Sequence, residues 1–318
     1  MSQSIYYCDE GVRIIIDLVK SFRPQQWIKN LAVVAPVFFS GQILNHNLWG
    51  SLIAAFIILC LASSGSYLIN DILDKEKDRL HPLKATRPIA SGKISKKVAF
   101  ITSKILILGS VLWSLHFRPF FTLVLISFLV IQLFYSLLLK RLIIFDVMSI
   151  AATFSLRVFA GAFILNVPVS VWLVVTIIML ALLLAIGKRR AEITLLSYQV
   201  AVKHREVVGH YPNVLLDGMT FMMATATVVT YTLFTFNVPL ASTRTRVVEI
   251  LPQTLSSPKW LMITVPFVLY GVFRYLYVIY EKKGGHSPER VLITDLPLLG
   301  AVIGWVIVAY FAVYIVVG

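Results

Sequence analysis

The chain has 318 residues and carries 29 Lys or Arg against 15 Asp or Glu, which gives a formal net charge of +14. Hydrophobic residues make up 58% of the chain and charged residues 14%, whereas typical soluble domains have about 25% charged residues. This composition excludes a soluble globular protein. The basic residues cluster between apolar stretches, in segments too short to form a nucleic-acid-binding domain, so we expect no nucleic acid partner.

The N-terminal residues 1–27 precede the first long apolar stretch and contain a candidate amphipathic helix. On a helix over residues 12–22, charged and apolar side chains fall on opposite faces. The charged face carries Arg13, Asp17 and Lys20. This pattern is typical of an interfacial helix at a membrane surface, and the alternative is a solvated turn.

Apolar stretches of about 20 residues, the length that crosses about 30 Å of hydrocarbon, recur along the chain. They predict nine membrane spans, at roughly residues 28–44, 48–69, 98–117, 119–139, 142–165, 168–187, 213–237, 259–280 and 291–317. Pro36 and Gly41 interrupt the first, which a span tolerates where neighbouring helices satisfy the freed carbonyls. We therefore expect an all-α polytopic membrane protein that forms a single domain over residues 1–318.

Lys and Arg are distributed unequally over the connections between these spans. Counted over alternate connections, one side has 22 of these residues and the other has 4, while three fall inside spans. Because basic connections are retained in the cytoplasm, we expect a protein of the cell (inner) membrane with a cytoplasmic N-terminus and an external C-terminus. We expect the active site on the two longest cytoplasmic connections, residues 70–97 and 188–212.

The connection after the second predicted span begins with regularly spaced carboxylates. Asp71, Asp74 and Asp78 stand at positions i, i+3 and i+7, so they share one face if the second helix continues to about residue 79. Mg²⁺, which prefers one or two carboxylates together with substrate phosphates, relieves the repulsion among such charges. The spacing therefore favours a diphosphate-bearing substrate, with Lys84 and Arg87 as clamps on its phosphate oxygens. The alternative is a solvated loop of mixed charge.

The second long connection starts with a basic helix end. Lys188, Arg189 and Arg190 follow the sixth predicted span, and Lys188 shares a helical face with Glu192. These basic groups either hold phosphates or anchor the helix at lipid headgroups, and the second role is the commoner one for any single Lys or Arg.

Ionisable residues inside predicted spans are costly and therefore informative. The fifth predicted span carries a polar stripe about 16 Å long, made of Asp146, Ser149, Thr153 and Arg157. Either a polar cavity open to the cytoplasm or an ion pair with another helix explains Arg157. For Arg274 and Asp295, at similar depth in the last two spans, we favour a structural pair.

Several strings resemble one enzyme superfamily. Asn70-Asp71-x-x-Asp74-x-x-x-Asp78, at the cytoplasmic end of a second span, resembles the first aspartate-rich motif of the UbiA superfamily of intramembrane prenyltransferases. Within it, His81-Pro82-x-Lys84-x-x-Arg87-Pro88-Ile89-Ala90-Ser91-Gly92 resembles the decaprenyl-phosphate phosphoribosyltransferases rather than the aromatic prenyltransferases. So do Arg23-Pro24-x-Gln26-Trp27-x-Lys29-Asn30, Tyr135-Ser136-x-x-x-Lys140 leading to Asp146-Val147, Leu156-Arg157-x-x-Ala160-Gly161 and Gly187-Lys188-Arg189-x-Ala191-Glu192. The resemblance covers about residues 20–200, with a weaker match at Arg274-Tyr275.

The chain departs from the aromatic prenyltransferases at one place. Those enzymes carry a second acidic motif, Asp-x-x-x-Asp, after the sixth span, where this chain has the basic segment Gly187-Lys188-Arg189-x-Ala191-Glu192. Two acidic clusters suit a metal-bridged isoprenyl diphosphate, whereas one acidic and one basic cluster suit two phosphorylated substrates. The resemblance therefore implies a UbiA-like helical bundle that transfers phosphoribose from phosphoribosyl diphosphate to a polyprenyl phosphate and releases pyrophosphate, a reaction of cell wall biosynthesis.

The same resemblance implies a cofactor and a set of site residues. The metal candidates are Asp71, Asp74 and Asp78, which are also the catalytic candidates, and which two of the three bind Mg²⁺ is left open. The lipid phosphate is already an anion, so no general base is expected, and catalysis depends on positioning and charge neutralisation. The candidate substrate-binding residues are Lys29, Asn70, Lys84, Arg87, Tyr135, Lys140, Asp146, Arg157, Lys188, Arg189 and Glu192.

Two other functions are alternatives on the sequence alone. The first aspartate motif by itself fits a UbiA-type prenyltransferase that uses an isoprenyl diphosphate donor on an aromatic or other acceptor. The polar stripe fits a transporter, but transporters have equivalent polar sites in two halves that open to opposite faces, and here the polar residues crowd the cytoplasmic side. A homo-oligomer is compatible with the sequence.

Overall fold

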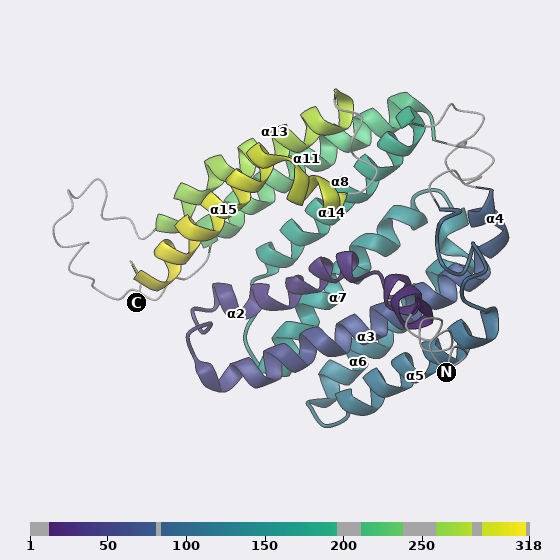
Figure 1. Cartoon of the computed structure of the whole chain (residues 1–318). Coiled ribbons are helices and arrows are strands. Elements are labelled where there is room, and N and C mark those ends of the chain that lie inside the picture. Colours follow the sequence, from purple (N-terminus) through teal and green to yellow (C-terminus); the bar gives the residue numbers. More distant parts are fainter. Residues whose placement is uncertain (1–12, 81–83, 196–210, 238–258, 282–287, 316–318) are drawn as a thin grey trace, which may run out of the picture.

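The computed structural model describes residues 13–80, 84–195, 211–237, 259–281 and 288–315, without the side chains of residues 192–195 and 288–290. Within these ranges every regular element is helical, and the helices form one elongated bundle (Figure 1). The all-α class expected from the sequence is confirmed.

The helical elements follow one another along the chain. They are η1 (Pro24–Val34), α2 (Ala35–Phe39), η2 (His46–Leu48), α3 (Trp49–Leu73), α4 (Lys75–Arg79), α5 (Lys96–Ser114), α6 (Pro119–Leu137), η3 (Leu139–Arg141), α7 (Phe145–Leu165), α8 (Val171–Leu195), α11 (Asn213–Asn237), η5 (Trp260–Thr264), α13 (Val265–Tyr280), α14 (Pro288–Thr294), α15 (Leu296–Tyr310) and the π-helical η6 (Phe311–Ile315).

Local sequence signals set several of these boundaries. Ser95 caps α5 by accepting a hydrogen bond from the Val98 N–H at 3.2 Å, and Asp295 caps α15 in the same way. Proline stands in the first turn of α6 and of α15, where its missing N–H costs no helical hydrogen bond.

Eight helices in the described ranges are long and apolar enough to cross a membrane. They match the second to ninth predicted spans and run His46–Leu73, Lys96–Ser114, Pro119–Leu137, Phe145–Leu165, Val171–Ala191, Asn213–Asn237, Trp260–Tyr280 and Leu296–Ile315. Their outer faces are apolar: on α5, Ile105, Leu108 and Leu112 are 60–64% exposed, as lipid-facing side chains are. The chain is a multi-pass membrane protein.

The first predicted span, residues 28–44, has a different form from the one expected. It is replaced by η1, a 3₁₀ helix of 11 residues, and α2, an α-helix of 5 residues. Since a 3₁₀ helix rises about 2.0 Å per residue, these two elements together extend about 30 Å. They start beside Arg23, which bonds Asp71 at the end of α3, and η2 then leads into the start of α3. The segment therefore traverses the bundle antiparallel to α3, as a span would.

Close backbone contact holds η1 against α7. A Cβ atom at Gly161 on α7 would lie 2.0 Å from the carbonyl oxygen of Val33 on η1, so only glycine fits there. Val33 belongs to a buried apolar cluster that joins η1 and α2 to α3, α6 and α7.

The helices form two groups that meet along α7 and α8. Figure 1 shows α3, α5, α6 and α7 on one side and α8, α11, α13 and α15 on the other. The C-terminal helices return to the first ones, because the Tyr314 hydroxyl donates to the Phe38 carbonyl at 2.6 Å and the Phe39 ring packs on that of Phe234. The bundle is thus closed by contacts between the two ends of the chain.

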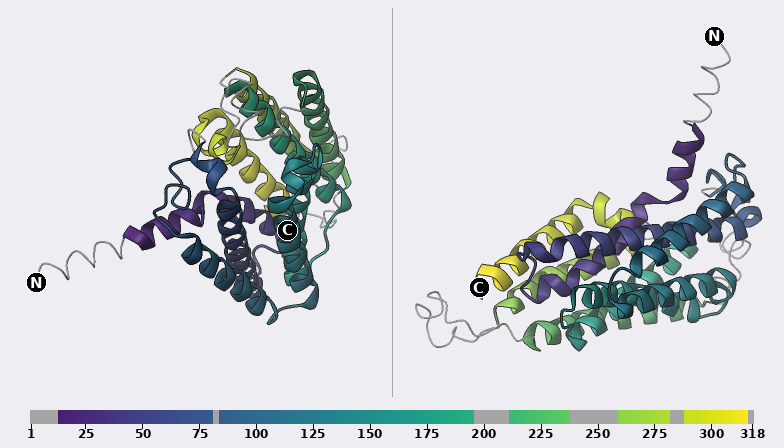
Figure 2. Two further views of the ribbon diagram at one scale, coloured as in Figure 1. Left: turned by 90° about the vertical axis from the view of Figure 1, so that its right-hand side faces the viewer. Right: turned by 90° about the horizontal axis from the view of Figure 1, so that it is seen from below.

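The predicted N-terminal helix is present over residues 13–21 and projects from the bundle, as both views of Figure 2 show. Ile14, Ile15 and Val19 are 45–62% exposed on it. Phe22, which follows the helix, packs on an apolar cluster around Leu68. The position of this helix at a membrane surface stays a prediction.

Candidate active site at the charged end of the bundle

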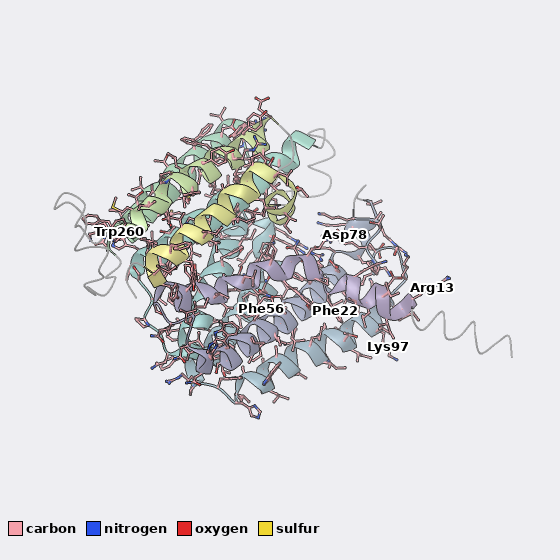
Figure 3. All side chains as sticks on the ribbon, turned by 60° about the vertical axis from the view of Figure 1, so that its left-hand side comes forward. Arg13, Phe22, Phe56, Asp78, Lys97 and Trp260 are labelled. Atoms are coloured by element: carbon pink, nitrogen blue, oxygen red, sulfur yellow. The ribbon has the colours of Figure 1, made fainter. Side chains whose placement is uncertain are left out.

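The charged connections gather at one end of the bundle. In Figure 3, Arg13, Asp78 and Lys97 lie at this end and Trp260 lies at the opposite end. This is the end expected to face the cytoplasm, and it carries the aspartate-rich connection.

Two of the three predicted aspartates converge on one arginine. Asp71 lies in the last turn of α3 and Asp78 lies on α4, seven residues later, which is about two helical turns. The Nη1 atom of Arg87 donates to both, at 3.1 Å to Asp71 and 2.6 Å to Asp78. Arg23 makes a second ion pair with Asp71. Both carboxylates are buried, at 3% and 5% exposure, so these guanidinium groups compensate charges that water does not reach.

The expectation that all three aspartates share one face of a continued helix was wrong for Asp74. Helix α3 ends at Leu73, Asp74 occupies the junction with φ −92° and ψ 4°, and α4 begins at Lys75. The Asp74 carboxylate accepts a hydrogen bond at 2.7 Å from Lys140, which follows α6 and also donates to Asn70 at 3.2 Å. Asp74 therefore has a different partner from the two carboxylates that Arg87 bridges.

The carboxylates of this site can be compared with the ligands that Mg²⁺ takes in proteins. In the described ranges no three His, Cys, Asp or Glu side chains gather closely enough to form a metal cluster. Mg²⁺ needs fewer, since it takes one or two carboxylates and completes its shell with water and phosphate oxygens. Asp71 and Asp78 already hold two oxygens around one cationic nitrogen, so these two of the three candidate aspartates fit a magnesium site.

A second cluster lies where α7 and α8 meet. Asp146, in the first turn of α7, pairs with Arg189 of α8 at 2.8 Å, and the two side chains are 0% and 1% exposed. The Tyr211 hydroxyl donates to the other Asp146 oxygen at 2.9 Å. Burial raises the pKa of Tyr211 to about 12, so this hydroxyl stays protonated at neutral pH and acts as a donor. The structure thus places Asp146 and Arg189, both substrate-binding candidates, in a buried pair.

The end of α8 has a further ion pair that sequence patterns did not predict. Arg190 donates to Asp217 of α11 at 2.6 Å, and the Tyr280 hydroxyl of α13 donates to the same carboxylate oxygen at 2.8 Å. Lys188, one residue before Arg189 on α8, is half-buried. The Glu192 side chain lies outside the described residues.

Arg157 lies deeper in α7 and is 2% exposed. It donates to the Asn30 amide oxygen of η1 at 2.8 Å and to the Thr153 carbonyl at 2.7 Å, and its guanidinium packs on the rings of Phe128 and Phe154. In the described part of the chain its partners are neutral, so the ion pair considered from the sequence is not found there. The pair of Arg274 with Asp295 is confirmed, with two hydrogen bonds of 2.8 and 3.0 Å.

The remaining candidates lie at the same end of the bundle as the aspartates. Lys29 bonds Gln26 on η1, and Lys29, Asn70, Lys84 and Tyr135 are all half-buried. Two site residues were not singled out from the sequence, Arg23 and Tyr211. Arg23 stands in the string that carries the family resemblance, which was a usable signal, whereas Tyr211 has no local pattern around it.

Known proteins resemble this chain over most of its length. The model of the UbiA prenyltransferase family matches residues 32–291. The chain is 30% identical over 306 residues to a decaprenyl-phosphate phosphoribosyltransferase of Mycolicibacterium smegmatis, covering 95% of this chain and 93% of the relative. It is 30% identical over 302 residues to a protein of the same name from Corynebacterium glutamicum, covering 94% of this chain and 87% of that one.

Solved structures show the same fold. A UbiA homologue from Archaeoglobus fulgidus bound to GPP and Mg²⁺ has a TM-score of 0.68 at 17% identity, over 95% of this chain and 99% of that one. A UbiA homologue from Aeropyrum pernix has a TM-score of 0.52 at 15% identity, over 89% of this chain and 98% of that one. The chain therefore belongs to the UbiA prenyltransferase family and is a membrane-embedded transferase.

Proposed function

We propose that this enzyme transfers phosphoribose from phosphoribosyl diphosphate to a polyprenyl phosphate and releases pyrophosphate, with Mg²⁺ as its cofactor. The observation that carries the proposal is the 30% identity over 95% of the chain to a decaprenyl-phosphate phosphoribosyltransferase. The charges at the site agree with it, because the second acidic motif of the aromatic prenyltransferases is replaced by the basic end of α8.

The donor would bind at the aspartates. Asp71 and Asp78 would hold Mg²⁺, which when bound stabilises the negative charge that develops on the departing diphosphate. Arg23 and Arg87 now compensate these carboxylates, and beside a bound cation they become available to grip phosphate oxygens. Lys140, held by Asp74 and Asn70, adds a third positive group next to them.

The acceptor supplies its own nucleophile. One oxygen of the polyprenyl phosphate forms a bond to the anomeric carbon while the bond from that carbon to the diphosphate breaks, so the enzyme removes no proton. Its residues instead hold two anionic groups close together, which lowers the barrier by positioning and charge neutralisation. We assign the acceptor phosphate to the side of Lys188 and Arg157, and the apolar tail to the spans around them. The remaining polar residues at the opening of the proposed site are Lys29, Lys84, Tyr135 and Glu192.

The chemistry would take place on the cytoplasmic face of the inner membrane. Counted along the sequence over alternate predicted connections, 22 Lys and Arg fall on the same side as the aspartate-rich connection and 4 fall on the other side. By the positive-inside rule the N-terminus and the active site are then cytoplasmic and the C-terminus is external.

The test is turnover of the purified full-length chain in detergent. Phosphoribosyl diphosphate, polyprenyl phosphates of several lengths and Mg²⁺ should give pyrophosphate and a ribosylated lipid, and chelation of the metal should stop the reaction. An isoprenyl diphosphate serves as the competing donor. Absence of turnover with every polyprenyl length, or transfer from the isoprenyl donor alone, would refute the proposal.

A further inference from the structure

Tyr211 connects three separate segments through one hydroxyl group. It lies two residues before the start of α11 and is 2% exposed. Its hydroxyl donates to Asp146 at 2.9 Å and accepts a hydrogen bond from the Ile144 N–H at 2.5 Å. Because Asp146 also pairs with Arg189, the hydroxyl ties the start of α11 both to the start of α7 and to the end of α8.

The backbone that Tyr211 holds is strained. Ile144 has φ +70° and ψ −46°, and the Phe145 N–H donates to the Ile143 carbonyl at 2.8 Å, which together define a tight γ-turn. A β-branched residue rarely adopts positive φ, and such strain persists only where surrounding contacts fix the backbone. The hydrogen bond from Tyr211 supplies such a contact.

This turn lies between the two clusters of the candidate site. Four residues before Ile144, Lys140 reaches Asp74 and Asn70 on the aspartate side. Two residues after it, Asp146 holds Arg189 on the side of the basic helix end. The conformation of the turn therefore sets the position of one cluster relative to the other.

We infer that Tyr211 is a positioning residue, whose hydroxyl fixes the turn at Ile144 and so aligns the aspartate cluster with the basic end of α8. The inference rests on the proposed function, in which these clusters hold the two reacting substrates. Tyr211 itself touches neither substrate. Removal of the Tyr211 hydroxyl should leave each substrate bound but misalign the two substrates relative to each other.

One substitution removes the Tyr211 hydroxyl alone, and a second buried tyrosine provides a matched control. The Tyr211 ring packs in an apolar cluster with Val147, Ile186 and Leu216, so Tyr211→Phe keeps the packing and removes only the hydroxyl. Tyr231, on α11 toward the other end of the bundle, is also buried, with its hydroxyl bonded to Thr264 and to Trp305, each at 2.6 Å. Tyr231→Phe therefore removes a comparable buried hydroxyl away from the site.

The experiment compares the two variants in purified full-length protein. We expect Tyr211→Phe to lower kcat at least about 10-fold, because small misplacements of reacting groups cost that much or more. Phosphoribosyl diphosphate with Mg²⁺ and polyprenyl phosphate, each titrated alone, should bind at full stoichiometry with Kd within about threefold of wild type, as expected when only alignment is lost. Tyr231→Phe should keep kcat within about twofold, since it does not contact the turn.

Hydrogen exchange gives a readout that needs no turnover. Peptides covering residues 138–147 and 186–191 should exchange faster in Tyr211→Phe than in Tyr231→Phe. Unchanged exchange in both peptides, kcat equal to that of the control, or a loss of kcat matched by lost binding stoichiometry would overturn the inference. If the wild type uses only an isoprenyl donor, the proposed function fails, while the same two variants still test Tyr211 on that donor.

Discussion

Arg87 accounts for the presence of two buried carboxylates so close together. Its Nη1 atom bonds both Asp71 and Asp78, and Arg23 adds a second cation to Asp71. A buried carboxylate left without such a partner is strongly unfavourable. The arginines therefore compensate the two buried acids and hold them close together.

Asp78→Asn should separate the catalytic role of this pair from its structural one. Because the amide is a poor Mg²⁺ ligand, kcat should fall by about 100-fold or more and the Mg²⁺ concentration needed for half-maximal rate should rise. Asp295→Asn, which weakens the pair with Arg274 elsewhere in the bundle, is the matched control and should keep most of the activity. Equal activity of the two variants at all Mg²⁺ concentrations would show that Asp78 holds no metal.

The ionisation of Tyr211 predicts a dependence of stability on pH. Burial raises its pKa to about 12, from an ordinary value of about 10. Since the folded pKa is the higher one, the stabilising contribution is complete below pH 10 and is lost as the pH rises from about 10 through about 12. The difference in Tm between wild type and Tyr211→Phe should be constant from pH 7 to 9.5 and shrink above it. A difference that changes between pH 7 and 9 would contradict this assignment.

At the scale of single residues, spacing predicted part of the site. The i, i+7 relation of Asp71 and Asp78 depends only on helical geometry, and these two do share a partner. Asp74 does not share this partner, because its carboxylate accepts a hydrogen bond at the helix junction from Lys140, 66 residues later in the chain. Tyr211 could not be found from the sequence, because its partners at Ile144 and Asp146 come together only when α7, α8 and α11 pack.

Among the elements, η1 depends on an approach that one glycine permits. A Cβ atom at Gly161 would overlap the Val33 carbonyl oxygen at 2.0 Å, a backbone atom that cannot turn aside. η1 also carries Asn30, the partner of Arg157, and follows directly on Arg23. The contact between η1 and α7 therefore helps to position two of the site arginines.

Gly161→Ala should destabilise the protein by about 3 kcal/mol or more, since the backbone of η1 has to move. Gly109→Ala on α5 is the control, because a Cβ atom there meets nothing within 4 Å. At that exposed helical position alanine should be neutral or stabilising by up to about 1 kcal/mol. Thermal unfolding in detergent measures both variants, and similar Tm values would rule out the close contact.

Hydropathy predicted the elements well where the signal is local. The second to ninth spans appear near their expected places, since a run of apolar residues is enough to specify a membrane helix. It could not predict the 3₁₀ geometry of η1 or the break at Asp74. Both lie at contacts with residues distant in the chain, Gly161 in one case and Lys140 in the other, which a hydropathy pattern does not contain.

For the molecule as a whole, the uneven distribution of charge predicts its orientation. In a chain whose native cysteines are replaced, Lys97→Cys lies at the end that carries Asp78, and Trp260→Cys lies at the opposite end. A membrane-impermeant maleimide added to intact cells should label Trp260→Cys alone, and it should label Lys97→Cys only after the membrane is opened. The reverse labelling pattern would place the aspartates outside the cell.

The proposed reaction depends on a metal held by the two carboxylates that Arg87 bridges. The most direct measurement is a structure of the full-length protein with phosphoribosyl diphosphate and Mn²⁺, located by its anomalous scattering. We predict a peak within coordination distance of both Asp71 and Asp78, with the donor diphosphate on the metal and Arg87 turned toward its phosphate oxygens. A metal bound away from both aspartates, or a donor that binds at another place in the bundle, would contradict the account.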